Sequence, residues 1–131
     1  MKYGLQFRDV FAAWESILEG VWITLLLSGL AMIGGLVIGI ACAAARVYGP
    51  SWLRRIVGTY VEVIRNTPLL VQLFLIFFGL PSLGLRLDGL TAAMIALVIN
   101  LGAYTTEIVR AGLEAVPKAQ IEAGHSLGLS G

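Results

Sequence analysis

Charged residues are scarce in this sequence, and their scarcity argues against an ordinary soluble protein. Only 13% of the 131 residues are Asp, Glu, Lys or Arg, whereas 58% are hydrophobic. A soluble domain of this length cannot bury so much apolar surface. Buried helices of soluble proteins also usually show a polar stripe, for which this chain has too few charges. The composition therefore predicts that lipid is the solvent for most of the chain.

Cysteine, histidine and lysine are almost absent as well. The lone cysteine, Cys42, cannot form an intramolecular disulfide and is interpreted as a small packing residue. The single histidine, His125, belongs to no cluster of metal-ligating residues, and neither lysine follows a glycine as in a G-x-x-x-x-G-K phosphate loop. No nucleophile is paired with a base, so the sequence predicts no catalytic residue, metal or cofactor. A net charge of +1 suggests no nucleic-acid partner.

Three stretches contain no charged residue and no histidine, namely residues 20–45, 66–85 and 89–106. At about 1.5 Å per helical residue they reach roughly 39, 30 and 27 Å, against a hydrocarbon core of about 30 Å. The pattern predicts an all-α membrane protein with one domain over residues 1–131 and spans at about 20–45, 67–85 and 89–109. Basic residues set the orientation. Six lie on one side and three on the other, which predicts an external N-terminus and a cytoplasmic C-terminus.

Amphipathic segments precede the first two spans. Residues 52–60 carry apolar side chains at helical spacing after the turn at Gly49-Pro50, which predicts a short surface helix. Asn66 or Thr67 is expected to cap the next helix, with Pro68 in an early position. Before the first span, a helix in the membrane interface is predicted from the spacing of Phe7, Val10, Phe11, Trp14, Ile17 and Leu18.

Small residues recur at every fourth position of the first span. This spacing puts them on one side of a helix, where another backbone can approach closely. The alternative is that Gly and Ala are simply common in membrane helices. The predicted packing face consists of Ala31, Gly35, Gly39 and Ala43.

Polar residues share one face of the third span, because Asn100, Tyr104 and Glu107 recur at steps of three and four residues. A charge at the centre of a membrane costs about 2.5 to 3.5 kcal/mol, so Glu107 should face the bundle interior or lie near the cytoplasmic boundary. These residues are candidates for a substrate path, together with Asn66 and Thr67 at the start of span two. Alternatively, Glu107 pairs with Arg110 and Asn100 bonds a neighbouring helix.

Three runs of residues resemble a known family. Residues 65–74 read R-N-T-P-L-L-V-Q-L-F, and residues 100–112 fit N-x-G-A-Y-x-x-E-I-x-R-A-G. After Pro117, Glu122, Ala123, Gly124 and Gly128 occupy positions of an E-A-A-x-x-x-G loop, with glycine at position 124 where alanine is usual. From about residue 22 onward the chain resembles permease subunits of bacterial ABC importers, in the branch for polar amino acids.

The resemblance implies a type I importer permease in the bacterial inner membrane, with the EAA-like loop over residues 117–131. Its implied partners are a cytoplasmic ABC ATPase that hydrolyses ATP, a second permease copy or sister permease, an external solute-binding protein, and membrane lipid. Coupling to the ATPase would pass through the loop. Because residue 131 falls inside the motif, we expect the chain to be incomplete. The alternative function is a small self-associating channel or scaffold, driven by the small-residue face.

Overall fold

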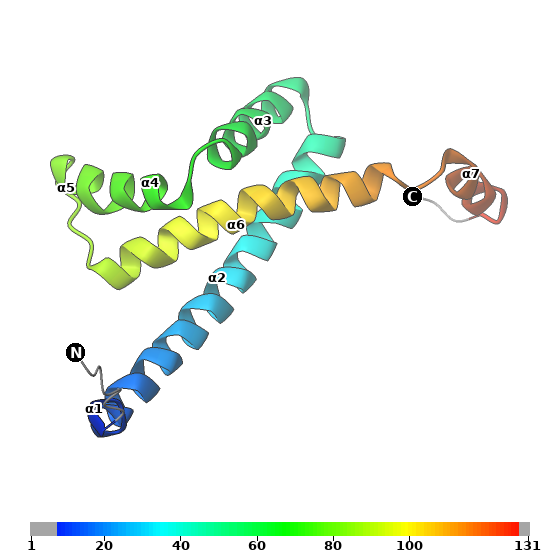
Figure 1. Cartoon of the computed structure of the whole chain (residues 1–131). Helices are drawn as coiled ribbons and strands as arrows, with labels where there is room; N and C mark the ends of the chain where they lie inside the picture. The colour runs from blue at the N-terminus through cyan, green and yellow to red at the C-terminus, as the bar shows by residue number, and fades with distance from the viewer. Residues whose placement is uncertain (1–7, 129–131) are drawn as a thin grey trace, which may run out of the picture.

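One long helix, α2 (Trp14–Tyr48), begins just after the short helix α1 (Arg8–Ala12) and runs from the lower left of Figure 1 up to the turn before the next helix. The amphipathic segment expected in the interface is divided between these two helices. Its second part, residues 14–19, continues into the first span as one helix, because it contains no Gly or Pro that would end a helix. Phe7 lies outside the described residues. The computed structural model describes residues 8–128, apart from the side chains of Arg8, Asp9, Lys118, Ile121, Gly124 and His125.

Helix α2 packs along helix α6 (Gly89–Glu114), which crosses it as Figure 1 shows. The buried residues of α2 are Ala31, Gly35, Gly39 and Ala43, and the small buried residues of α6 are Ala92, Ala96, Gly102 and Ala103. A methyl group added at Gly35 would lie 2.6 Å from Cβ of Leu101, and one at Gly39 would lie 2.5 Å from Cβ of Thr105. Two helix backbones approach this closely only where side chains are very small.

The chain between α2 and α6 is bent sharply. Helix α3 (Ser51–Arg65) follows the turn at Gly49-Pro50, and the next helical stretch, Leu69–Ser82, is inclined to it by 106°. That stretch consists of α4 (Leu69–Phe74), the wider helical turn η1 (Leu75–Gly79) and α5 (Leu80–Ser82). Pro68 explains the break, since it has no amide hydrogen and disfavours helical geometry in the residue before it.

The prediction that Asn66 or Thr67 caps the helix after the bend is wrong. Pro68 itself is the N-cap residue of α4, and no side chain bonds the first amides. The Thr67 hydroxyl instead donates to the carbonyl of Val63 at 2.7 Å, while the backbone N–H of Asn66 donates to the carbonyl of Glu62 at 3.1 Å. Both residues therefore extend the last turn of α3, because Pro68 breaks the helix directly after them.

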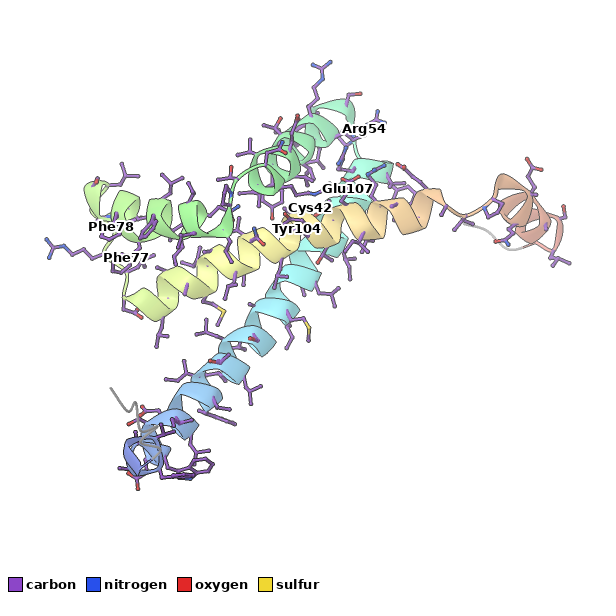
Figure 2. The ribbon with its side chains drawn as sticks, viewed as in Figure 1. Cys42, Arg54, Phe77, Phe78, Tyr104 and Glu107 are labelled. Atoms are coloured by element: carbon purple, nitrogen blue, oxygen red, sulfur yellow. The ribbon has the colours of Figure 1, made fainter. Side chains whose placement is uncertain are left out.

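Within the described residues, α2 and α6 are each long and apolar enough to cross a membrane. The helices α3 and Leu69–Ser82 reach that length and apolarity only when the bent pair is counted as one span. The helical stretch Leu69–Ser82 would reach about 21 Å alone, short of a hydrocarbon core of about 30 Å. Large apolar side chains point outward along α2 (Figure 2), and Trp22 and Val37 are 66% and 63% exposed. Such surfaces suit contact with lipid or with further helices.

Candidate functional site

The buried side chain of Gln72 joins three helices. Its amide nitrogen donates to the carbonyls of Ile64 and Thr67, both at 2.8 Å, and its amide oxygen accepts from the Asn100 amide at 3.2 Å. The two carbonyls lie at the end of α3, where backbone acceptors have no partner within the helix. Gln72 thus satisfies the end of α3 from α4 and ties both helices to α6. Sequence reasoning did not select Gln72, although it is the one amide between Asn66 and the next charged residue, Arg86.

A second polar contact lies one helical turn away. The Tyr60 hydroxyl donates to the carbonyl of Ile99 at 2.6 Å, which holds α3 against α6. Gly102 leaves the room for this approach, because a Cβ atom there would lie 2.9 Å from the Tyr60 oxygen. The middle of α6 is therefore bound to α3 by Tyr60 and to α4 by Asn100.

An ion network closes the far end of the same face. Glu107 accepts from Nη1 of Arg46 at 2.9 Å, so a carboxylate of α6 is paired with a guanidinium of α2. Its other oxygen accepts from Arg110, which also pairs with Glu114. The side chains of Arg46 and Glu107 are 28% and 23% exposed, so both charges are partly withdrawn from solvent and depend on each other.

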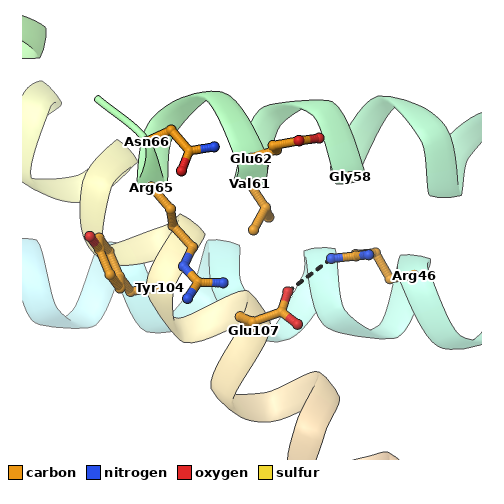
Figure 3. Close-up of a pocket in the computed structure, with 8 residues that line it drawn as sticks. All are labelled: Arg46, Gly58, Val61, Glu62, Arg65, Asn66, Tyr104 and Glu107. Carbon is orange, nitrogen blue, oxygen red and sulfur yellow. Dashed lines mark hydrogen bonds and ion pairs between the residues drawn. The ribbon is translucent and has the colours of Figure 1, made fainter. Parts of the chain in front are cut away.

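A polar pocket of about 420 Å³ lies between these contacts, where α3 faces α2 and α6 (Figure 3). The guanidinium of Arg65 lies over the Tyr104 ring, 5.5 Å from its centroid. A cation over an aromatic face is attracted by the ring quadrupole. The pocket is lined by Arg46, Gly58, Val61, Glu62, Arg65, Asn66, Tyr104 and Glu107.

The structure brings together three of the five residues expected on a substrate path, namely Asn66, Tyr104 and Glu107. The other two face other partners, since Asn100 donates to Gln72 and the Thr67 hydroxyl donates to Val63. Arg65, Arg46 and Glu62 were missed as lining residues. Their charges lie outside the apolar stretches, and Arg65 meets Tyr104 only because α3 packs against α6.

The EAA-like loop begins with helix α7 (Lys118–Ser126), which stands apart from the other helices (Figure 1). Glu122 and Ala123 are exposed on it. Gly128 follows with a φ of +78°, a left-handed conformation that favours glycine. The surroundings of Gly124 and the last three residues of the loop, 129–131, lie outside the described part of the chain.

A family model described as "Binding-protein-dependent transport system inner membrane component" matches residues 35–131. The chain belongs to this family. The match takes in the small-residue face from Gly35, the polar pocket, the Gln72 junction and α7. The family resemblance drawn from residues 65–74, 100–112 and 122–128 is thereby confirmed.

Several proteins similar to this inner membrane component are named as amino acid permeases. It is 41% identical to the L-cystine transport system permease protein TcyB of Bacillus subtilis (strain 168) over 117 residues, which cover 89% of this chain and 50% of that one. It is 42% identical to the glutamine transport system permease protein GlnP of Escherichia coli (strain K12) over 127 residues, covering 93% and 58%. The chain thus spans little more than half the length of these relatives.

A solved structure shares the fold. The crystal structure described as "an amino acid ABC transporter with histidines" matches with a TM-score of 0.89 and 38% sequence identity. The match covers 97% of this chain and 59% of that one. The chain therefore shares its fold with a chain of that structure, and the predicted all-helical membrane fold is confirmed.

Proposed function

We propose that this inner membrane component is the permease subunit of an ATP-driven importer and forms part of the path for a polar amino acid. The observation that carries the proposal is the match of nearly the whole chain to the solved amino acid transporter, at 38% identity. Glutamine and cystine are named for its relatives. Substrates of this chemical class carry a carboxylate and an ammonium group, and the polar pocket offers charges of both signs.

The path we propose runs along the polar face of α6. Asn66, Tyr104 and Glu107 line the pocket, and Asn100 and Thr67 lie near its edge toward α4. Outside this face, α2 and α6 present mainly apolar side chains. A polar substrate crossing the membrane needs such a strip of hydrogen-bonding groups in an otherwise apolar wall.

Coupling to ATP hydrolysis is assigned to α7 and the turn after it. A short helix that projects from the bundle and exposes Glu122 and Ala123 can seat in a groove of a cytoplasmic ATPase and receive a push from it. We include Gly124 in this contact, because small residues permit close seating. The left-handed Gly128 then turns the chain after the helix.

The proposed assembly contains two permease subunits, either two copies or a copy with a sister protein, two ABC ATPase subunits, an external solute-binding protein and surrounding lipid. ATP hydrolysis belongs to the ATPase. The N-terminus is placed outside the cell membrane and the EAA-like loop in the cytoplasm, as the distribution of basic residues suggests.

The alternative, a self-associating channel or scaffold, rested on a free small-residue face. In the structure this face is occupied within the same chain, because Gly35 and Gly39 lie against Leu101 and Thr105 of α6. A permease should copurify with an ABC ATPase and a scaffold should not. The decisive test is ATP-dependent uptake of labelled amino acid by vesicles holding the assembled transporter, compared with the Glu122→Ala variant. We expect that variant to assemble and hydrolyse ATP while uptake falls, and unchanged uptake would contradict coupling through α7.

A further inference from the structure

Among the described side chains, Arg65 differs from the other arginines near the pocket in forming no salt bridge. Arg46 and Arg110 both pair with Glu107. Among residues 8–128, no carboxylate whose side chain is described lies within 4 Å of the Arg65 guanidinium. Its guanidinium instead lies over the face of the Tyr104 ring. Figure 3 shows the guanidinium held beside this ring, at the edge of the pocket.

Tyr104 lies on the polar face of α6, one turn before Glu107, so Arg65 brings a second guanidinium to this face beside that of Arg46. Ionisable groups in membrane helices are costly and usually face a polar path or a substrate. The stacking on Tyr104 also holds the guanidinium in one orientation. Its unstacked edge, with several N–H donors, stays available to a ligand in the pocket.

The pocket selects the kind of ligand by size and charge. Its volume of about 420 Å³ suits a small molecule. The lining holds two arginines and two glutamates, so it is formally neutral and favours a zwitterion over a multiply charged anion. Once Arg46 and Glu107 have neutralised each other, Arg65 is the cation that remains. A planar guanidinium matches a carboxylate through two parallel hydrogen bonds.

We propose that Arg65 binds the α-carboxylate of an amino acid in this pocket, with Tyr104 as the platform that orients the guanidinium. The inference rests on the proposed function, because that function supplies an amino acid as the ligand. It adds a specificity-determining residue that hydrogen-bonds the group common to all amino acids, which leaves side-chain selection to other parts of the pocket.

Direct binding tests this role. The assembled transporter, without the external solute-binding protein, is placed in lipid nanodiscs and titrated with labelled L-glutamine, L-cystine and L-histidine, and with the amide of each, in which the α-carboxylate is blocked. We expect the wild type to bind at least one of the three amino acids. Arg65→Gln should weaken that binding roughly 10- to 100-fold, as expected for loss of a charge-assisted pair. Arg54→Gln is the matched control, since Arg54 lies on the same helix, is exposed and bonds Ser51 at 3.4 Å.

The amides distinguish direct contact from a folding defect. If Arg65 touches the carboxylate, the amide should bind wild type and Arg65→Gln equally weakly. Equal losses of affinity for the free acid and the amide in Arg65→Gln would overturn the proposal. A wild type that binds none of the three amino acids would overturn it as well. Arg65-dependent binding together with absent ATP-dependent uptake would support this inference and contradict the proposed function.

Discussion

At the scale of single residues, the side-chain amide of Gln72 determines what Asn100 contacts on the polar face of α6. Gln72 is only 5% exposed, and both ends of its side chain are bonded, to the carbonyls of α3 and to Asn100. Asn100 therefore has a structural partner in the folded chain. This contact favours the interpretation of Asn100 as a bond between helices over the interpretation as a direct substrate contact.

Replacing these residues separates the two roles. Gln72→Leu should destabilise the protein by about 1 to 3 kcal/mol, because it removes the partly buried hydrogen bonds to the carbonyls of Ile64 and Thr67 and the bond to Asn100. Asn100→Leu should cost about 0.6 to 2 kcal/mol and lower the yield of assembled complex without changing amino acid preference. Thermal unfolding in detergent and uptake kinetics measure both effects. Gln120→Leu, at an exposed position of α7, is the control. A shifted amino acid preference in Asn100→Leu would contradict the structural role.

At the scale of elements, the contact between α2 and α6 is the main packing interaction. Thr106 of α6 is fully buried, and its hydroxyl donates to the carbonyl of Gly102 at 2.6 Å. The first residues of α6 are stabilised differently. Asp88 is the N-cap residue, and its carboxylate accepts from the amides of Leu90 and Thr91, both at 3.1 Å, and from the Thr91 hydroxyl.

The α2 glycines provide a matched pair of substitutions. Gly39→Ala should destabilise the protein by about 1 to 3 kcal/mol through overpacking, because the added methyl would lie 2.5 Å from Thr105. Gly29→Ala on the same helix has nothing within 4 Å and should be neutral or slightly stabilising. Thermal unfolding in detergent compares the two. Equal stability of both variants would mean that α6 does not pack closely at Gly39.

The cap at Asp88 should make the stability of α6 depend on acid pH. Hydrogen bonds from the Thr91 side chain and backbone lower the pKa of Asp88 below its ordinary value. A lowered pKa stabilises the fold above the unfolded-state pKa of about 4, and this contribution is lost as pH falls through the folded-state pKa. Asp88→Asn keeps a capping oxygen without titrating, so its melting temperature should vary less than that of the wild type between pH 6 and pH 3. Identical pH profiles would contradict this role.

At the scale of the whole molecule, the features proposed for transport occur in sequence along α6 and beyond it. The Asn100 contact, the pocket at Tyr104 and the Glu107 network follow one another toward α7. If α6 crosses the membrane, its two ends lie on opposite sides. The loop at Gly84 and the EAA-like loop must then face different compartments.

A reporter experiment checks this orientation. A reporter fused after Gly131 should be active only in its cytoplasmic form, and one inserted at Gly84 only in its external form, following the distribution of basic residues. Gly84 suits insertion, because it lies in an exposed turn with a φ of +86°. Both reporters on the same side would show that α6 does not cross the membrane, and an external Gly131 would reverse the orientation.

The sequence by itself determined the helical membrane character, the family and the small-residue face, because all three depend on local composition and spacing. Charge-free stretches predict α2 and α6, and residues four apart share a side of a helix whatever that side packs against. The tertiary structure alone decided which polar groups meet. The packing of α3 and α4 against α6, on either side of the 106° bend at Pro68, brings Arg65 to Tyr104 and Gln72 to Asn100 across 39 and 28 residues. Side-chain periodicity carries no information about contacts between separate helices, so Arg65 became visible as a ligand-binding candidate only once α3 had been placed against α6.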